Sequence, residues 1–148
     1  MSDERSKQRV LFLCTGNSCR SQMAEGFVRE YGGDAFEVAS AGVDPTRINP
    51  LAVRVMAEAA VDISAQYSKS VDEMTGQHFD YVITVCDHAR DVCPIFPRAI
   101  RSLHWSFEDP AEATGAEHDR LVVFRRVRDE IGAQVRAFVS NIHRERDV

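Results

Sequence analysis

The stretch Val10-Leu-Phe-Leu-Cys14-Thr-Gly-Asn-Ser-Cys19-Arg20-Ser21 decides how this chain is interpreted. It begins with a short apolar run typical of a buried strand and breaks into small polar residues. It then continues into residues 22–30, which are typical of a helix. Small residues allow successive backbone N–H groups to turn inward around an anion, and a helix N-terminus adds positive partial charge. The stretch therefore predicts a strand, an anion-binding loop and a helix, in that order.

The anion loop, residues 14–21, also carries reactive side chains. Arg20 supplies a planar fork that suits a tetrahedral oxyanion, and the same positive field favours the thiolate form of Cys14, a nucleophile. Ser21 is placed either to hydrogen-bond the Cys14 sulfur or to cap the helix. The simpler alternative is a buried cysteine before an ordinary strand-to-helix turn. We expect an oxyanion to be bound by Thr15, Gly16, Asn17, Ser18, Cys19, Arg20 and Ser21.

Length and composition limit the possible functions. The 148 residues predict a flexible polar tail at 1–8 and a single domain at 9–148. A net charge of −5 without a basic tract argues against nucleic acid, and no apolar run is long enough to span a membrane. The polar N-terminus lacks a signal-peptide pattern, so we expect a cytoplasmic protein. We also expect a monomer, because the sequence shows no unexplained apolar surface stripe. In the cytoplasm, the four cysteines are more often reactive or metal-bound than structural disulfides.

Apolar periodicity predicts alternating strands and helices. Strands are expected at 9–14, 36–41, 79–86 and 100–105, and helices at 21–31, 51–60, 70–77 and 119–142. The predicted class is α/β, with a small four-stranded parallel sheet flanked by helices on both faces. Functional sites in such sheets lie beyond the carboxyl ends of the strands. Cys14 and Cys86 end two of these strands and Asp109 follows the fourth, so we expect them along one edge.

A second cysteine pair occurs in Cys86-Asp-His-Ala-Arg-Asp-Val-Cys93. The residues alone leave three interpretations open: two buried structural cysteines, a zinc site using all four cysteines, or a redox pair. The spacing lacks the short C-x₂₋₄-C pairs that zinc sites usually show. A fully helical 86–93 would separate the two Cα atoms by about 10.5 Å, whereas a disulfide tolerates at most about 7 Å. A Cys86–Cys93 disulfide therefore requires this segment to loop or unwind.

Asp109-Pro110 is common in turns, which is the simpler interpretation. At the strand-end edge, Asp109 is also placed to act as general acid toward an oxyanion leaving group, or as base toward a thiol. The five histidines show no ligand spacing, so we assign none of them to catalysis and expect no metal or other cofactor.

These residues together resemble the thioredoxin-coupled arsenate reductases, which share their fold with low-molecular-weight protein tyrosine phosphatases. The resemblance covers nearly the whole chain after residue 8. It rests on residues 14–25 and on the landmarks Ser40-Ala-Gly42, Asn49-Pro50, Thr84-Val-Cys86, Cys93-Pro94, His104-Trp105, Asp109-Pro-Ala111 and Phe124–Ile131. The anion loop is common to both groups, whereas the Cys86/Cys93 pair favours the reductases.

The resemblance implies a three-cysteine relay. Cys14 attacks arsenate, for which phosphate and sulfate would compete, and Cys86 attacks the Cys14–arsenic adduct to release arsenite. Cys93 then moves the disulfide to Cys86–Cys93, which thioredoxin reduces, while Asp109 serves as acid and base. Arsenate reduction takes two electrons, which one dithiol supplies when it becomes a disulfide, and outward transfer gives a protein reductant access. Cys19 has no redox role in this scheme.

Two alternatives remain beside the reductase: a phosphotyrosine phosphatase using Cys14, Arg20 and Asp109, and a non-enzymatic oxyanion or redox sensor. One departure from the family concerns potassium. Some members bind it through residues matching Asn17, Glu25 and Ser40 plus an acidic residue, and Lys69 matches that last position here. We expect the lysine ammonium to occupy the potassium position and activity to be independent of potassium.

Overall fold

The computed structural model describes residues 7–85 and 99–146. Its strands are β1 (Gln8–Cys14), β2 (Phe36–Gly42), β3 (Phe79–Thr84) and β4 (Ala99–His104), and its α-helices are α1 (Arg20–Gly32), α2 (Pro50–Glu58) and α3 (Glu117–Arg146). Three short 3₁₀ helices complete the described part: η1 (Gly33–Ala35), η2 (Val71–Met74) and η3 (Pro110–Glu112). The predicted strands and the helices at 21–31, 51–60 and 119–142 are confirmed where they lie inside the described residues, with most ends shifted by one or two positions. The helix expected over 70–77 is the shorter η2.

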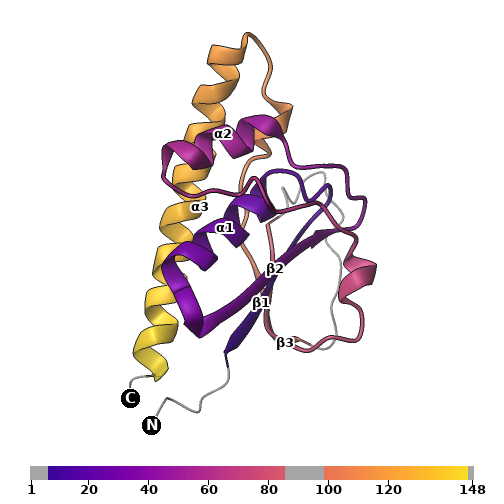
Figure 1. Cartoon of the computed structure of the whole chain (residues 1–148), viewed down its shortest axis with the longest axis vertical. Helices are drawn as coiled ribbons and strands as arrows, with labels where there is room; N and C mark the ends of the chain where they lie inside the picture. Colours follow the sequence, from indigo (N-terminus) through magenta and orange to yellow (C-terminus); the bar gives the residue numbers. More distant parts are fainter. Residues whose placement is uncertain (1–6, 86–98, 147–148) are drawn as a thin grey trace.

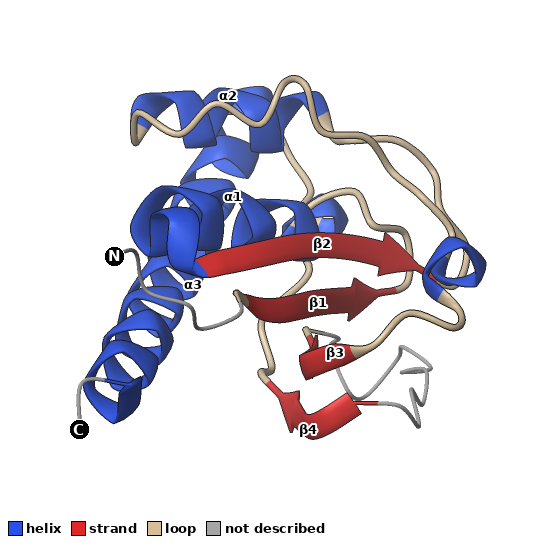
Figure 2. Cartoon of the chain, turned by 60° about the horizontal axis from the view of Figure 1, so that its bottom comes forward, coloured by secondary structure: helices blue, strands red, loops and turns tan. Residues whose placement is uncertain are grey.

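The four strands form one parallel sheet in the order β2-β1-β3-β4 (Figure 2). Cys14 pairs with Gly42 at the end of β1, and Leu13 pairs with Thr84 on the other side. The carboxyl ends of three strands therefore meet around Cys14. The predicted α/β class with a four-stranded parallel sheet is confirmed.

The two faces of the sheet are covered differently, as the alternation along β1 shows. Val10 and Phe12 belong to the large apolar cluster built with α1, α2 and α3. Leu11 and Leu13 point the other way, into a smaller cluster that contains Met74 of η2. In Figure 1 the long α3 runs beside α1 and α2. Among the described residues, the element that packs on the second face is the short 3₁₀ helix η2 and not an α-helix. It lies where the sequence predicted a helix over 70–77.

Local sequence explains where the helices begin. The Asn49 side chain accepts a hydrogen bond from the Leu51 backbone at 2.8 Å and caps α2, with Pro50 in the first turn. The expected C-terminal helix starts earlier than predicted, at Glu117, and runs to Arg146. Its buried apolar residues recur at helical spacing: Leu121, Phe124, Val127, Ile131, Val135 and Phe138.

Several predictions lie outside the described residues. These concern Cys86, Cys93, the segment between them, and the tail up to residue 6. Val85, directly before the gap, donates its N–H to the Leu13 carbonyl at 2.9 Å. No helix within 7–85 or 99–146 has the length and apolar character needed to cross a membrane.

Candidate active site

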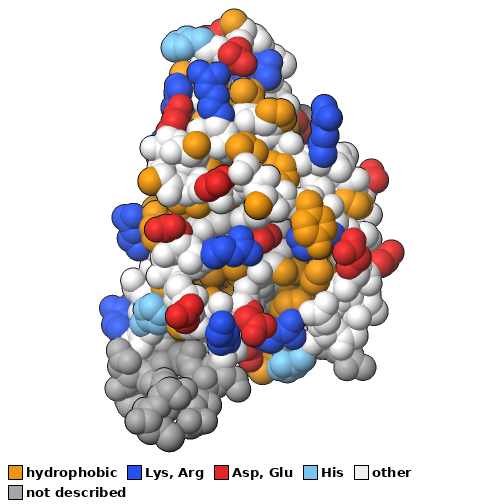
Figure 3. All heavy atoms as spheres, in the orientation of Figure 1, with side chains coloured by type: hydrophobic (Ala, Val, Ile, Leu, Met, Phe, Trp, Pro, Cys, Tyr) orange, Lys and Arg blue, Asp and Glu red, His pale blue; other side chains and the backbone are white. Residues whose placement is uncertain are grey.

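The anion loop borders a cavity of about 250 Å³ at the carboxyl edge of the sheet. The cavity is lined by Cys14, Thr15, Gly16, Ser18, Cys19, Arg20, Asp44, Thr46 and Asp109. Acidic and basic side chains are interspersed over the face shown in Figure 3, without a broad basic field. Among the described residues, the one basic side chain that lines the cavity is Arg20, so attraction of an anion here depends on local groups rather than on the net charge of −5.

The backbone of the loop is held from outside by residues 43–49. The N–H groups of Val43, Asp44, Thr46 and Asn49 donate to the carbonyls of Cys14, Thr15, Gly16 and Ser18 at 2.9–3.3 Å. These bonds occupy the loop carbonyls on the side of residues 43–49. The Thr15 hydroxyl oxygen is buried and has no hydrogen-bond partner among the described residues, which leaves it available to a bound oxyanion.

Arg20 and Asp109 meet at this cavity, as the sequence predicts. Arg20 is 4% exposed, and its guanidinium donates to the Phe107 carbonyl at 3.3 Å. Its Nη2 lies 3.6 Å from Asp109 Oδ2. The other carboxylate oxygen of Asp109 accepts from the Ala111 backbone at 3.0 Å and caps η3. Asp109 therefore caps the turn with one carboxylate oxygen and faces Arg20 at the cavity with the other.

Two polar groups contact the Cys14 sulfur inside the protein. Ser21 Oγ lies 2.9 Å from Cys14 Sγ, and the Asn17 backbone N–H donates to the same sulfur at 3.2 Å. Asn17 adopts φ = 51°, in the left-handed region, where asparagine is more common than most residues. The side chains of Asn17 and Ser21 do not line the cavity; they lie behind it and contact one another at 2.8 Å. They support the nucleophile from the protein side.

Cys19 differs from Cys14 in its environment. Burial raises the pKa of the Cys19 thiol from 9.0 to about 12, despite the hydrogen bond from Ser18. A thiol that stays protonated at neutral pH is a poor nucleophile. This agrees with the expectation that Cys19 contributes to the loop but not to redox chemistry.

A buried polar cluster surrounds Asn17. Its side-chain amide donates to Ser40 Oγ at 2.9 Å, and Ser40 donates to Glu25 at 2.6 Å. The expectation that the Lys69 ammonium joins this cluster is wrong: Nζ donates to the Tyr67 carbonyl at 3.2 Å and lies over the Tyr67 ring. Only the Lys69 backbone N–H reaches the cluster, at Asn17 Oδ1. The cation paired with Glu25 is Arg29, at 2.6 Å.

Asp44 and Thr46 line the cavity but were not predicted from the sequence. Their position directly after β2, at the same sheet edge as Cys14, was the signal that could have found them. They place a second carboxylate and a hydroxyl at the cavity mouth. No group of three or more potential His, Cys, Asp or Glu metal ligands occurs within the described ranges.

Comparison with known proteins finds one matching protein family and several similar proteins. The family described as low molecular weight phosphotyrosine protein phosphatase matches residues 9–148. An arsenate reductase from Halalkalibacterium halodurans is 50% identical over 135 residues, covering 91% of this chain and 97% of that protein.

Solved structures agree with the sequence match. An arsenate reductase in the phosphate binding state superposes with a TM-score of 0.79 at 33% identity, covering 91% of this chain and 98% of that one. A thioredoxin-dependent arsenate reductase from Corynebacterium glutamicum gives 0.74 at 29% identity, covering 97% of this chain and 65% of that one.

Proposed function

Because the chain belongs to the low molecular weight phosphotyrosine protein phosphatase family, and to the arsenate reductases within it, we propose that it reduces arsenate to arsenite. The observation that carries the proposal is one cavity containing a buried cysteine, the Arg20 guanidinium and the Asp109 carboxyl. These groups supply a nucleophile, an oxyanion clamp and a proton carrier within one small space.

The first step forms a Cys14–arsenic bond. The loop amides and Arg20 hold arsenate, the Cys14 thiolate attacks arsenic, and Asp109 protonates the oxygen that leaves as water. The contacts of Cys14 Sγ with the Ser21 hydroxyl and the Asn17 N–H hold the sulfur in position for the attack. This step does not change the oxidation state of arsenic, and it uses the same chemistry as a phosphatase.

The electrons come from two thiols. The Cys86 thiolate attacks Cys14 Sγ, the sulfur–arsenic bond breaks, and its electron pair stays on arsenic, which leaves as arsenite. Cys93 then attacks Cys86, so the disulfide becomes Cys86–Cys93 and Cys14 is released as a thiolate. The hydrogen bond from Val85 to Leu13 supports the first transfer, because it holds the residue before Cys86 beside the residue before Cys14.

Thioredoxin is the proposed reductant of the Cys86–Cys93 disulfide. Its dithiol becomes a disulfide as the enzyme regains its two thiols, so the electron balance closes. Such a cycle requires a compartment in which thiols are kept reduced, which supports a cytoplasmic location. We propose that the protein acts there as a monomeric single domain over residues 9–148, without a metal.

The experiment follows NADPH consumption with arsenate, thioredoxin and thioredoxin reductase, for the wild type and Cys93→Ser. The wild type should turn over, whereas the variant should release one arsenite per chain and stall as Cys14–Cys86, identified by peptide mass spectrometry. Continued cycling of Cys93→Ser would refute the relay. Replacing thioredoxin by a low-molecular-weight thiol, and measuring arsenite formation, tests which reductant the enzyme uses.

The phosphatase remains the second candidate, supported by a further cavity beside the first. It measures about 570 Å³, shares Thr46 with the oxyanion cavity, and includes Ile48, Pro50 and the ring of Tyr67 in its lining. The organic part of a phosphate ester would fit there. Efficient hydrolysis of an aryl phosphate, combined with no arsenite formation, would favour this candidate over the reductase.

A further inference from the structure

Asp44 gives the oxyanion cavity a second carboxylate, to which the proposed reaction assigns no task. It lies two residues after β2, at the carboxyl edge of the sheet, and its backbone N–H donates to the Thr15 carbonyl at 2.9 Å. This bond involves main-chain atoms alone, so it holds the Asp44 backbone against the anion loop. The side chain adds only a negative charge at the cavity.

The charged groups that line the cavity do not balance one another. Among the described residues, Arg20 is the one basic residue in the lining, whereas Asp44 and Asp109 are both acidic. Arg20 Nη2 already lies 3.6 Å from Asp109 Oδ2. Asp44 has no ion-pair partner within residues 7–85 and 99–146. An entering oxyanion therefore meets one cation, which it shares with Asp109, and a second carboxylate without a cation of its own.

A carboxylate differs from the other polar groups of the cavity because it accepts hydrogen bonds and donates none. The lining hydroxyls can turn either to donate or to accept, so they suit any oxyanion oxygen. The carbonyls of the anion loop already accept N–H groups from residues 43–49. Asp109 protonates the leaving oxygen in the proposed reaction, which makes it a donor there. Asp44 is therefore the group that requires a proton from the ligand.

Tetrahedral oxyanions differ in whether they carry such a proton. Arsenate and inorganic phosphate retain at least one proton at neutral pH, whereas sulfate is fully deprotonated. The protonated oxygen of arsenate can donate to a carboxylate, and hydrogen bonds to charged groups are stronger than ordinary ones. A sulfate oxygen has no hydrogen to donate, so beside the same carboxylate it experiences repulsion alone.

We propose that Asp44 is a specificity-determining residue that accepts the proton of the bound oxyanion and so favours arsenate and phosphate over sulfate. The inference rests on the proposed function, since it takes this cavity as the oxyanion site. It narrows the expected competitors of arsenate to phosphate. Because Asp44 is exposed, water screens part of its charge, so the preference lies at the lower end of the range for hydrogen bonds to charged groups.

The test measures how phosphate and sulfate protect Cys14 from alkylation by iodoacetamide. Peptide mass spectrometry distinguishes Cys14 from the other cysteines, and the concentration that halves the alkylation rate gives the dissociation constant of each ion. At slightly alkaline pH and constant ionic strength, both ions are dianions of similar size, and the proton of phosphate is the main difference between them. The wild type should bind phosphate about tenfold more tightly than sulfate, the effect of one hydrogen bond to a charged group.

Two variants of Asp44 remove the charge. Asp44→Asn keeps the shape of the side chain, and its amide can donate to a sulfate oxygen, so the preference for phosphate should fall about tenfold. Asp44→Ala removes the acceptor without adding a donor, so the preference should fall by a smaller factor. Full retention of the preference in both variants would overturn the proposal.

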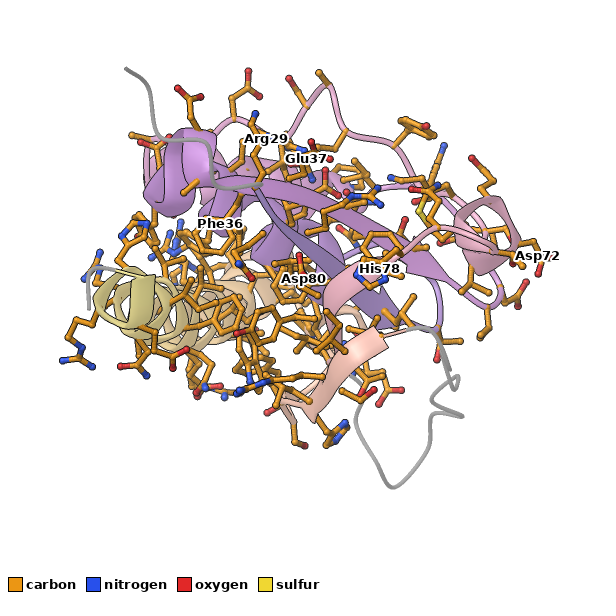
Figure 4. All side chains as sticks on the ribbon, turned by 90° about the horizontal axis from the view of Figure 1, so that it is seen from below. Arg29, Phe36, Glu37, Asp72, His78 and Asp80 are labelled. Carbon is orange, nitrogen blue, oxygen red and sulfur yellow. The ribbon has the colours of Figure 1, made fainter. Side chains whose placement is uncertain are left out.

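Asp34→Asn is the matched control. Asp34 is an exposed carboxylate in η1, directly before β2, so this variant changes the net charge equally at the amino edge of the sheet. Figure 4 shows how far apart the two edges are, with Glu37 near the start of β2 and Asp72, in η2, beyond its end. Asp34→Asn should keep the wild-type preference. An equal loss in Asp34→Asn and Asp44→Asn would reveal a net-charge effect and contradict the role of Asp44.

Protection of Cys14 does not depend on turnover. If phosphate protects with the expected preference but arsenate is not reduced, the proposed reaction falls and the role of Asp44 stands. If arsenate is reduced but sulfate protects the wild type as well as phosphate does, the role of Asp44 falls alone. Thermal unfolding of each Asp44 variant should match that of the wild type, because the backbone bond to Thr15 remains.

Discussion

Arg20 Nη2 and Asp109 Oδ2 lie 3.6 Å apart at the rim of the cavity that Cys14 lines. Arg20 comes from the start of α1, and Asp109 from the cap of η3, far along the chain. A guanidinium that binds an oxyanion and a carboxyl that carries a proton therefore face the same small space.

Replacing Asp109 by Asn should lower the single-turnover rate of arsenite formation by about 10²–10⁴-fold, because the proton carrier is lost. Asparagine also caps helices well, so η3 and the unfolding temperature should be preserved. Asp109→Ala removes both functions and should lose stability as well. A wild-type rate in Asp109→Asn, measured by rapid quench, would exclude the acid–base role.

Gly42→Ala should damage the anion loop although Gly42 lies outside it. A Cβ atom there would meet the Thr15 carbonyl at 2.5 Å and the Asn17 nitrogen at 3.0 Å. The backbone must shift, which should cost about 1–3 kcal/mol of unfolding free energy and weaken phosphate binding. At Gly16, inside the loop, the nearest atom is Thr46 Oγ1 at 3.5 Å, an ordinary contact, so Gly16→Ala should cost less. Denaturant unfolding and phosphate titration of both variants check this order.

Cys19 should make the fold sensitive to alkali. Its pKa is 9.0 when unperturbed and is raised by burial to about 12 in the folded protein. Above about pH 9 the unfolded chain releases this proton while the folded protein keeps it, so stability falls by about 1.4 kcal/mol per pH unit until the folded pKa is reached.

Denaturant unfolding of the reduced protein at about pH 8 and about pH 10 measures this loss. Cys19→Ala should lack it while sharing the background effects of lysine and tyrosine ionisation. Equal slopes in the two proteins would contradict the buried, protonated thiol.

Activity should be independent of potassium. Glu25 already pairs with Arg29, and Asn17 and Ser40 already bond one another. Rates in potassium and in sodium salts at equal ionic strength should therefore agree, whereas Arg29→Met should become sensitive to added cations. A large gain specific to potassium in the wild type would show that the site still accepts the ion.

The sequence predicted most of the sheet because its strands are short apolar runs separated by clear turn residues. It also placed Asp109 beside Cys14, since the carboxyl ends of parallel strands meet at one edge. The Lys69 backbone N–H reaches Asn17, but the ammonium contacts Tyr67, contrary to the prediction. Sequence position fixes where a backbone lies, whereas the direction of a long side chain depends on tertiary neighbours.

The same limit explains the residues that were missed. Asp44 and Thr46 follow β2 at the carboxyl edge of the sheet, which marks them as candidates, but their contact with the cavity depends on how residues 43–49 run along the anion loop. A chain of hydrogen bonds from Arg29 to Asn17 passes through Gln66, which comes from the segment after α2 and meets α1 only in the folded protein. Networks assembled from three separate segments have no signal in a single stretch of sequence.

The backbone bonds between residues 43–49 and the anion loop also bear on how such a site can evolve. They use main-chain N–H groups alone, and Pro45, which has no N–H, falls where none is required. Exchange of the Asp44 side chain at the cavity therefore leaves these bonds in place, whereas Thr46 also donates its hydroxyl to the Gly16 carbonyl at 3.5 Å. Substitutions at Asp44 can therefore change substrate preference during evolution while Cys14 and the backbone of the anion loop stay the same.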